Sequence, residues 1–489
     1  MGRIDARSSK EIEGRWSMMD RINQIIAANG WTAGELTIGD CIELAKAAQV
    51  RVSDVVVAEA MTTSNMTRSE VYSAVLASFS HNLYAVEIGT TTGSSFLMGT
   101  AGRELTQEAA PQIVADEFLN KVLAYTLGAQ VGNHSVGLQP CAGTGDSCTY
   151  VGFVRAMLEE LDDKETVARV AAVMLKIGTL FRVGKTTTGC NMEGFGAGAA
   201  ASAAAFVELA GGKPADMAKA IVLAISPTIA NPCTPRVMVA GLCATHIGGG
   251  VMLGKLAAQL AMHTSIPVNV PVDVMIAMAA AVHPVSAKQV VPVVIQYMEP
   301  FFKTNTAVEN YIGEDVHTEE TARIAATVRQ ALAEARAMAK KANSIVKPFG
   351  EAVVGGSSQA VGSPANAARI AHFLAKGKIT KVRIELYPEL FARRGINVPG
   401  ILMAAVYGAG TDNSQLYREV MSKVANEGIE VEILQTDEPQ LQQITVVAAE
   451  KSGMVAALNR GGGRLVLKRA SDEEEAYRVA KRLGIEIVE

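Results

Sequence analysis

The hydrophobic periodicity of this 489-residue chain changes once, close to residue 347. Before that point, segments such as CIELAKAAQ and TRSEVYSAVLASFSHNLYAVEIG have the spacing of amphipathic helices, and Thr67 with Glu70 forms a capping-box pattern. After it, KITKVRIELY, GIEVEILQT, QITVVAAE and GRLVLKR alternate or are β-branched, as strands are. The sequence therefore predicts a mainly α-helical N-terminal domain over residues 1–347 and a smaller C-terminal α/β domain over residues 348–489.

Composition sets limits on both the packing and the partners. Aromatic residues make up only 5% of the chain, whereas glycine alone occurs 44 times, so we expect tightly packed helices whose small residues permit close approach. The formal net charge is −4, and the scattered lysines and arginines form neither a basic stripe for nucleic acid nor a polybasic anchor for a membrane. We expect a protein that acts on small molecules, without nucleic acid or membrane partners.

Two long uncharged runs do not predict a membrane span. The run between Lys121 and Asp146 is interrupted by polar side chains, a proline and glycines. The run between Arg236 and Lys255 contains His246 and three consecutive glycines, and it barely reaches spanning length. The N-terminus is charged from its start, which is not the pattern of a secretory signal. We therefore expect a cytoplasmic protein whose cysteines are reduced.

The stretch RVGKTTTGCNMEGFGAG, Arg182 to Gly198, looks like a phosphate-binding loop but departs from both known patterns. A P-loop requires a glycine five residues before its Gly-Lys pair, and the residue five before Gly184 is Thr179. The GFGAGA portion has the dinucleotide-binding spacing, but that spacing has meaning only after a strand, and no strand precedes it. The chemistry of this stretch is therefore expected to centre on Cys190.

The cysteines fall into two groups. Cys41 lies within a plain helical pattern, where a buried and inert thiol is expected. The others lie in glycine- or proline-rich breaks between helical segments: Cys141, Cys148, Cys190, Cys233 and Cys243. Singly, each is explained as a small buried hydrophobe, but together they lie where exposed backbone N–H groups stabilise thiolates and cluster sulfides. The C-x2-C knuckle of structural zinc sites is absent; spacing alone leaves zinc open, while widely separated thiolates suit an iron–sulfur cluster.

Several of these segments together resemble one family. SVGLQPCAGTGDSC is similar to S-M-G-R-I-V-A-A-P-T-A-G-S-C of the iron–sulfur-dependent L-serine dehydratases, or L-serine ammonia-lyases. GCNMEGFGAGAAAS looks like their G-C-Q-x-E-V-G segment with its alanine-rich helix, and CTPRVMVAGLC resembles C-D-P-V-A-G-L-V-E-V-P-C, one residue shorter. GGSSQAVGSP, VRIELY, GAGTD and NRGGGRLV are similar to motifs of the family's β part. The resemblance spans residues from about 40 to 470, with the α part preceding the β part, the reverse of common single-chain members.

The resemblance implies a [4Fe–4S] cluster held by Cys190, Cys233 and Cys243 in the helical domain. The iron without a cysteine ligand would act as a Lewis acid on the substrate's carboxylate and β-hydroxyl. A base removes the α-proton, water leaves, and the aminoacrylate product hydrolyses to a keto acid and ammonia. L-Serine is the leading substrate, giving pyruvate. Pyridoxal phosphate is not required, and Lys185 is better explained as a solvated or anion-contacting side chain than as a Schiff-base lysine.

Two departures from the family concern its histidines. The histidine of S-S-H-T corresponds to Gln359, and that of G-H-G-T-D corresponds to Ala409. Because neither residue can act as a base, another residue takes the proton, the substrate differs from serine, or the C-terminal domain is regulatory or structural. His134, His246 and Asp146 are the candidate catalytic residues; a satisfied core histidine and a capping aspartate are the alternatives.

Further site residues follow from the same motifs. Thr144 and Ser147 could donate hydrogen bonds to a substrate carboxylate, and Cys148 belongs to the same matched turn. Arg236 could clamp a carboxylate bidentately, with an exposed arginine as the alternative. Glu193 matches the glutamate that follows the cluster cysteine in the family, and is expected to orient the cluster ligands without itself binding the metal.

The departures keep other functions open. One is a related lyase that eliminates sulfide from L-cysteine, as a desulfidase does, or water from another hydroxy acid. Another is a non-catalytic subunit whose C-terminal domain senses an amino acid. In each case the partner is a small amino acid or hydroxy acid. The many apolar helical faces also favour a homodimer.

Overall fold

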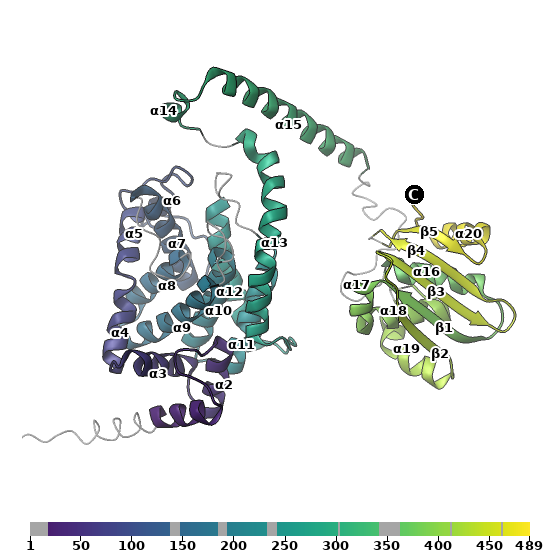
Figure 1. Cartoon of the computed structure of the whole chain (residues 1–489), viewed down its shortest axis with the longest axis horizontal. Coiled ribbons are helices and arrows are strands. Elements are labelled where there is room, and N and C mark those ends of the chain that lie inside the picture. Colours follow the sequence, from purple (N-terminus) through teal and green to yellow (C-terminus); the bar gives the residue numbers. More distant parts are fainter. Residues whose placement is uncertain are drawn as a thin grey trace, which may run out of the picture. The chain divides into compact units, whose positions relative to one another are not determined.

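The chain forms two compact units, residues 1–333 and 334–489, and each is considered by itself (Figure 1). The computed structural model describes residues 18–136, 147–183, 193–231, 242–301, 304–341, 362–410, 413–460 and 463–489. The first unit is helical, and the second carries a five-stranded sheet with helices. This confirms the predicted fold class. The predicted domain boundary between residues 347 and 348 lies outside the described residues.

The N-terminal unit is built from successive helices. Residues 18–28 are helical. The helices that follow, in chain order, are α2 (Ile38–Ala48), α3 (Val52–Ser64), α4 (Arg68–Ala77), α5 (Ser80–Thr90), α6 (Ala101–Glu104), α7 (Glu117–Val136), α8 (Ser147–Glu160), α9 (Lys164–Val183), the π-helical turn η1 (Glu193–Ala197), α10 (Gly198–Leu209), α11 (Pro214–Ile225), the 3-10 turn η2 (Ser226–Thr228), α12 (Leu242–His263), α13 (Val272–Met298), the 3-10 turn η4 (Glu299–Phe301), α14 (Thr306–Glu309) and α15 (Glu314–Lys341), which runs across the boundary between the units.

Side-chain caps fix where several of these helices begin. Thr67 accepts a hydrogen bond from the backbone N–H of Glu70, and the Glu70 carboxylate accepts one from the N–H of Thr67, at 3.3 and 2.7 Å. This is the capping box that the sequence predicts at the start of α4. The Thr37–Asp40 pair caps α2 in the same way.

The alanine-rich helix α10 lies at the centre of the N-terminal core. Every residue from Gly198 to Glu208 is buried, and the helix packs against α8, α9, α11 and α12. At one end of it, Phe206 makes edge-to-face contacts with Phe118 and Phe153, at centroid distances of 6.4 and 4.8 Å. A helix that is buried on all sides requires small residues, because its neighbours approach from every direction.

Glycines bring α5 and α7 into direct backbone contact. A Cβ atom on Gly89 of α5 would overlap the carbonyl oxygen of Gly128, and one on Gly132 of α7 would overlap the carbonyl oxygen of Ala85. Gly102 of α6 meets the same crossing, since its Cβ would overlap the oxygen of Gly89. The predicted close approach of helices through small residues is thus confirmed at this crossing, where no side chain larger than hydrogen fits.

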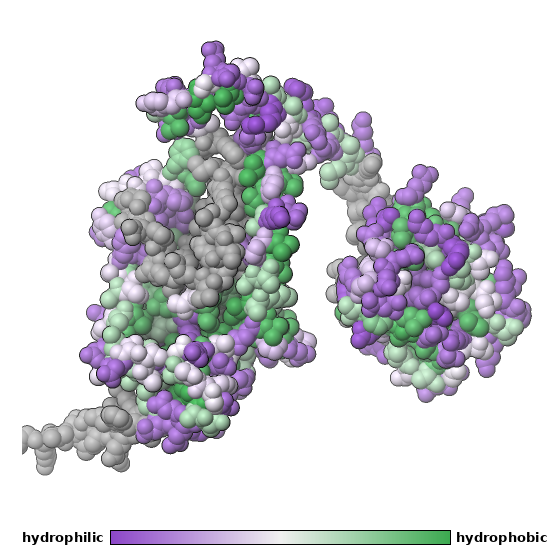
Figure 2. Space-filling model, viewed as in Figure 1, coloured by the Kyte–Doolittle hydropathy of each residue, from purple (hydrophilic) through white to green (hydrophobic). Residues whose placement is uncertain are grey.

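Helix α13 presents an apolar surface. Among the described helices, one stretch is long and apolar enough to cross a membrane: residues 272–301, which comprise α13 and η4. Its most apolar 18-residue window has a mean hydropathy of 1.4, and 22% of this window is buried. Val285, Val293 and Phe301 are 63%, 53% and 61% exposed, and Figure 2 shows apolar residues along this helix. Length and composition alone are weak evidence for a membrane, because core helices share them.

The C-terminal unit is a mixed sheet in the order β2-β1-β3-β4-β5. Its elements are α16 (Gly362–Leu374), β1 (Ile379–Leu386), α17 (Pro388–Ala392), α18 (Arg394–Tyr407), α19 (Ser414–Asn426), β2 (Glu430–Gln435), β3 (Leu441–Ala448), β4 (Gly453–Asn459), β5 (Leu465–Ala470) and α20 (Glu473–Leu483). β1 pairs with β2 in parallel and with β3 antiparallel, and β3, β4 and β5 are antiparallel. Helix α16 packs against β3 and β4, and also against α18 and α20.

The glycine contact generates a stability prediction. Gly132→Ala should destabilise the protein by about 1–3 kcal/mol, because the added methyl meets a backbone oxygen that no rotamer change can move. Gly248→Ala on α12 is the matched control, since its Cβ would lie 3.7 Å from the nearest side-chain atom, Leu123 Cδ2. The control should be neutral or up to about 1 kcal/mol more stable. Urea unfolding measures both, and equal stability of the two variants would contradict the contact.

Candidate functional site

The predicted site residues fall into three groups by what the structure describes. Those outside the described residues are Thr144, Asp146, Cys190, Cys233 and Arg236. Ser147, Glu193 and Cys243 lie in the first turn of a helical element whose backbone, but not these side chains, the structure describes. Those with described side chains are His134, Cys148 and His246. These three side chains show how the elements around the site contact one another.

The helical ends next to the three cysteine-bearing segments lie together. Helix α8 begins directly after residues 137–146, η1 begins directly after 184–192, and α12 begins directly after 232–241. η1 packs against α8, α9 and α12, and α12 also packs against α7 and α8. The turn η1 therefore contacts both α8 and α12 within the N-terminal unit.

Individual side chains carry these contacts. The ring of Phe195 in η1 lies 4.6 Å, centroid to centroid, from the ring of His246 in α12. Gly198, where α10 follows η1, faces Thr149 in the first turn of α8, since a Cβ atom on this glycine would lie 3.0 Å from Thr149 Oγ1. Gly249 faces Phe195 in the same manner. The predicted residue His246 thus contacts η1, and Thr149, which follows the predicted residue Cys148, contacts the beginning of α10.

The π-helical turn η1 is a local feature of the same region. It covers Glu193–Ala197, the sequence EGFGA, and runs without a break into α10. π-Helical turns are rare within proteins and occur often at functional sites, because the wider turn re-aims the residues that flank it. Here the turn comes three residues after Cys190 in the sequence.

His134 is held from both sides near the end of α7. Its Nδ1 lies 2.7 Å from Ser95 Oγ, and its Nε2 lies 2.6 Å from the side-chain amide of Gln130. Ser95 Oγ accepts the backbone N–H groups of Leu97 and Met98, both at 3.1 Å. With both oxygen lone pairs engaged in this way, the Ser95 hydroxyl proton is directed at His134 Nδ1.

This pattern determines which ring nitrogen of His134 carries the proton. If Nδ1 accepts from Ser95, a neutral imidazole carries its proton on Nε2, and that N–H requires an acceptor. Gln130 Oε1 has no partner among the described residues, and the oxygen and nitrogen of a side-chain amide are interchanged by half a turn. The chemically consistent orientation of Gln130 therefore places Oε1 against Nε2. His134 is a positioned, hydrogen-bonded imidazole; to act as a base it would first release Ser95.

Cys148 lies beside this histidine network. Its thiol is 2% exposed, and its Sγ accepts a hydrogen bond from Asn133 Nδ2 at 3.0 Å. Asn133 precedes His134 on α7, while Cys148 is the second residue of α8, so the pair joins the end of one helix to the beginning of the next. Residues 137–146, which carry Thr144 and Asp146, lie between these two helices in the sequence.

Cys41 belongs to a different class of thiol. It is fully buried in α2, and burial raises its pKa to about 12, against a lesser opposite effect of Lys176. A thiol of this kind stays protonated and unreactive at neutral pH. The predicted inert cysteine is confirmed.

A metal site is not formed by the described side chains alone. Within the described part of the chain, no group of three histidine, cysteine, aspartate or glutamate side chains could hold a metal ion. The predicted ligands Cys190, Cys233 and Cys243 are not among those side chains. Soft thiolates remain the donor set that suits an iron–sulfur cluster. In the sequence, Cys243 comes three residues before His246, and Cys190 comes five residues before Phe195, the two residues whose rings are in contact.

The motif segments of the C-terminal unit also converge. Asn366 Nδ2 donates to the carbonyl of Gly463 at 2.9 Å, and Arg369 Nε donates to the carbonyl of Gly408 at 3.4 Å. Gly463 of NRGGGRLV and Gly408 of GAGTD thus both contact α16, whose first residue, Gly362, also faces Gly463. Gln359 lies outside the described residues, and Ala409 follows α18 as a half-buried residue. A methyl group at this position carries no proton.

Sequence reasoning missed the partners of the site residues. Gln130 and Asn133 stand out only as polar residues inside an apolar helix, and that is the signal that could have revealed them. Ser95 is separated from His134 by 39 positions and carries no signal of its own.

Comparisons with known proteins agree with the resemblance in part of the chain. The chain is 23% identical over 253 residues to a protein of Bacillus subtilis (strain 168) named as a probable L-serine dehydratase, alpha chain. The match covers 48% of this chain and 81% of that protein. No protein-family model matches the chain.

The histidine network generates a second prediction. Ser95→Ala removes the donor to His134 and the acceptor of two backbone N–H groups, and should cost about 1–3 kcal/mol of stability. It should also shift the His134 ring away from the Nε2–H tautomer, as measured by the 15N resonances of the imidazole. Ser80→Ala, which removes an exposed hydroxyl bonded to the Ala77 carbonyl, is the control and should stay within about 0.5 kcal/mol. Unchanged 15N resonances in Ser95→Ala would refute the tautomer assignment.

Proposed function

We propose that this protein is an iron–sulfur-dependent lyase that dehydrates and deaminates a small β-hydroxy amino acid, with L-serine converted to pyruvate and ammonia. The observation that carries the proposal is the contact of η1 with α8 and α12, through Phe195 against His246 of α12 and through Gly198, directly after η1, against Thr149 of α8. In the sequence, α8, η1 and α12 each directly follow a segment that contains cysteine, which supports the proposal that thiolates from distant parts of the sequence share one site. The similarity to the Bacillus subtilis protein over 48% of the chain supports a serine dehydratase-like function.

The thiolates of Cys190, Cys233 and Cys243 would hold a [4Fe–4S] cluster. When bound, the cluster supplies Lewis acidity for the departure of a hydroxyl group. The chain's own residues bind and orient the substrate: Arg236 pairs with its carboxylate, and Thr144 and Ser147 donate hydrogen bonds to it. The Asn133–Cys148 hydrogen bond joins α7 to α8, the two helices that flank residues 137–146 in the sequence.

Proton transfer is assigned to residues near the same helix ends. His246 lies against Phe195 at the beginning of α12, and Asp146 immediately precedes α8. The engagement of His134 by Ser95 and Gln130 favours a positioning role for it and leaves His246 and Asp146 as the stronger candidates for the base that removes the α-proton.

A second candidate function is favoured by Ala409. Because this residue and Gln359 replace histidines of the family, the C-terminal unit supplies no imidazole at either position. A related lyase acting on L-cysteine or another hydroxy acid, or a non-catalytic subunit that senses an amino acid, would tolerate both replacements.

The proposal is tested on protein purified without oxygen. Cys190→Ala, Cys233→Ala and Cys243→Ala should each lose most of the bound iron and sulfide and at least about a hundredfold of pyruvate formation from L-serine, because each removes a ligand. Cys41→Ala, at the inert thiol of α2, should retain the wild-type iron content and activity.

The outcomes separate the alternatives. Iron content that is insensitive to the three substitutions would contradict the proposal. An intact cluster with release of sulfide from L-cysteine but no ammonia from L-serine would support the second lyase, and a cluster with ligand binding but no turnover would support the sensing subunit.

A further inference from the structure

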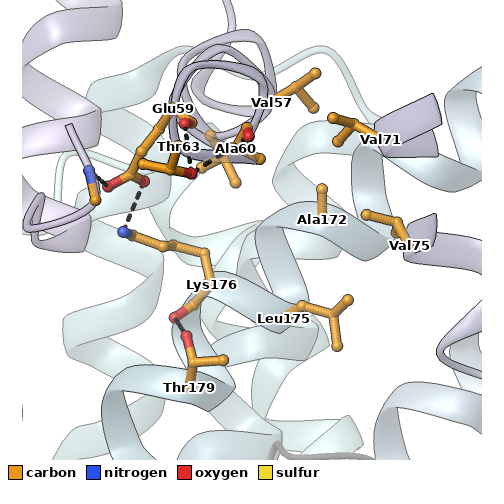
Figure 3. A pocket seen from close by; sticks show the side chains of 12 residues that line it. Val57, Glu59, Ala60, Thr63, Val71, Val75, Ala172, Leu175, Lys176 and Thr179 are labelled. Atoms are coloured by element: carbon orange, nitrogen blue, oxygen red, sulfur yellow. Dashed lines mark hydrogen bonds and ion pairs between the residues drawn. The ribbon is translucent and has the colours of Figure 1, made fainter. Parts of the chain in front are cut away.

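A cavity of about 290 Å³ lies between α3, α4 and α9 (Figure 3). It shares no lining residue with the candidate site described above. Its polar end is formed by Glu59 of α3 and Lys176 of α9, with Thr63 and Thr179 beside them. Its volume lies at the lower end of the range for ligand pockets, roughly 300–1,000 Å³, and therefore suits a small molecule.

The polar end consists of a buried ion pair that is built into the fold. Lys176 Nζ lies 2.7 Å from Glu59 Oε2, and the two side chains are 14% and 7% exposed. Glu59 Oε1 accepts the backbone N–H groups of Gly34 and Leu36 at 3.1 and 3.3 Å. Because these bonds fix the carboxylate, the positions of both charges are set before any ligand arrives.

Each partner of the pair retains unused bonding capacity toward the cavity. An ammonium group has three N–H donors. Among the described residues, Lys176 Nζ donates to Glu59, which leaves donors for a ligand. Glu59 Oε2 accepts one bond, from Lys176, and a carboxylate oxygen can accept a second. The hydroxyls of Thr63 and Thr179 donate to backbone carbonyls and leave their oxygens able to accept.

The charge pattern selects the ligand. A lone carboxylate at Lys176 would lie next to the Glu59 carboxylate, and a lone ammonium at Glu59 would lie next to Lys176, so each single charge meets a like charge in a poorly solvated site. A molecule that carries both charges on adjacent atoms forms an alternating arrangement with the pair and adds no net charge. That is the structure of an α-amino acid zwitterion.

The remaining walls select the side chain. Val57, Val71, Val75, Ala172 and Leu175 line the cavity, and Figure 3 shows Val71, Val75 and Leu175 on the side away from the ion pair. A hydroxyl group placed against these side chains would find no acceptor, whereas a branched aliphatic group would bury apolar surface. We propose that this cavity binds an aliphatic α-amino acid such as L-leucine, with its ammonium at Glu59 and its carboxylate at Lys176.

Isothermal titration calorimetry on the full-length protein tests the ligand class. L-Leucine should bind, and 4-methylpentanoate, which lacks the ammonium, and 3-methylbutylamine, which lacks the carboxylate, should each bind at least about tenfold more weakly, since a charge-assisted hydrogen bond contributes about 1.5–3 kcal/mol. L-Serine should bind at least about tenfold more weakly for lack of apolar contact. No heat of binding with millimolar L-leucine, or equal affinity for 4-methylpentanoate, would overturn the proposal.

Substitutions locate the site. Ala172→Leu fills the cavity without touching the ion pair, and Thr179→Leu narrows it from an exposed position that tolerates a larger side chain. Both should weaken L-leucine binding at least about tenfold, whereas Ala326→Leu, at an exposed alanine of α15, should not change it. Wild-type affinity in both cavity variants would place any binding elsewhere and refute the site. Circular dichroism verifies that each variant is folded.

The result is independent of the proposed lyase activity. The titration is carried out on protein handled in air, where an oxygen-sensitive cluster plays no part, and serine turnover is measured separately on protein purified without oxygen. Leucine binding without serine turnover would leave this inference standing and defeat only the proposed function; turnover without leucine binding would do the reverse.

Discussion

The direct backbone contact between α5 and α7 is the constraint on which the candidate site depends. Gly89 and Gly132 allow the two helices to approach until only hydrogen fits between them. This approach places the segment that follows α5, with Ser95, against the end of α7, so that Ser95 reaches His134. A wider crossing would separate these groups and leave a half-buried imidazole without its donor, at a cost comparable to a lost hydrogen bond.

The same use of small residues continues through the N-terminal core. The alanine-rich helix α10 is enclosed by its neighbours, and η1 at its beginning touches both α8 and α12. Two side-chain contacts connect the helices of this region. Asn133 of α7 donates a hydrogen bond to Cys148 of α8, and the ring of Phe195 in η1 packs against the ring of His246 in α12. The packed helical core thereby fixes α8, η1 and α12, which directly follow in the sequence the three segments that carry most of the predicted ligands and substrate contacts. The Glu59–Lys176 cavity lies elsewhere in the same unit, between α3, α4 and α9, and has a different chemistry.

The sequence predicted the fold class because periodicity and caps are local. The capping box of Thr67, the buried thiol of Cys41 and strands β1, β2, β3 and β5 follow from short patterns. Strand β4, GMVAALN, was missed, because its small residues show neither alternation nor β-branched enrichment. The Ser95–His134 bond, the meeting of Phe195 with His246 and the Glu59–Lys176 pair join residues 39 to 117 positions apart, and no local pattern specifies which distant helices pack together.

The proposed cluster requires Cys190 to lie within bonding reach of the same metal group as Cys233 and Cys243. Dibromobimane, which bridges two neighbouring thiols, tests it on cluster-free protein without reference to activity. In a variant with Cys41 and Cys148 replaced by alanine, peptide mass spectrometry should find Cys190 bridged to Cys233 or Cys243. Reaction of Cys190 only as a singly modified residue, with bridges confined to Cys233 and Cys243, would show that the segments do not meet and would contradict the account.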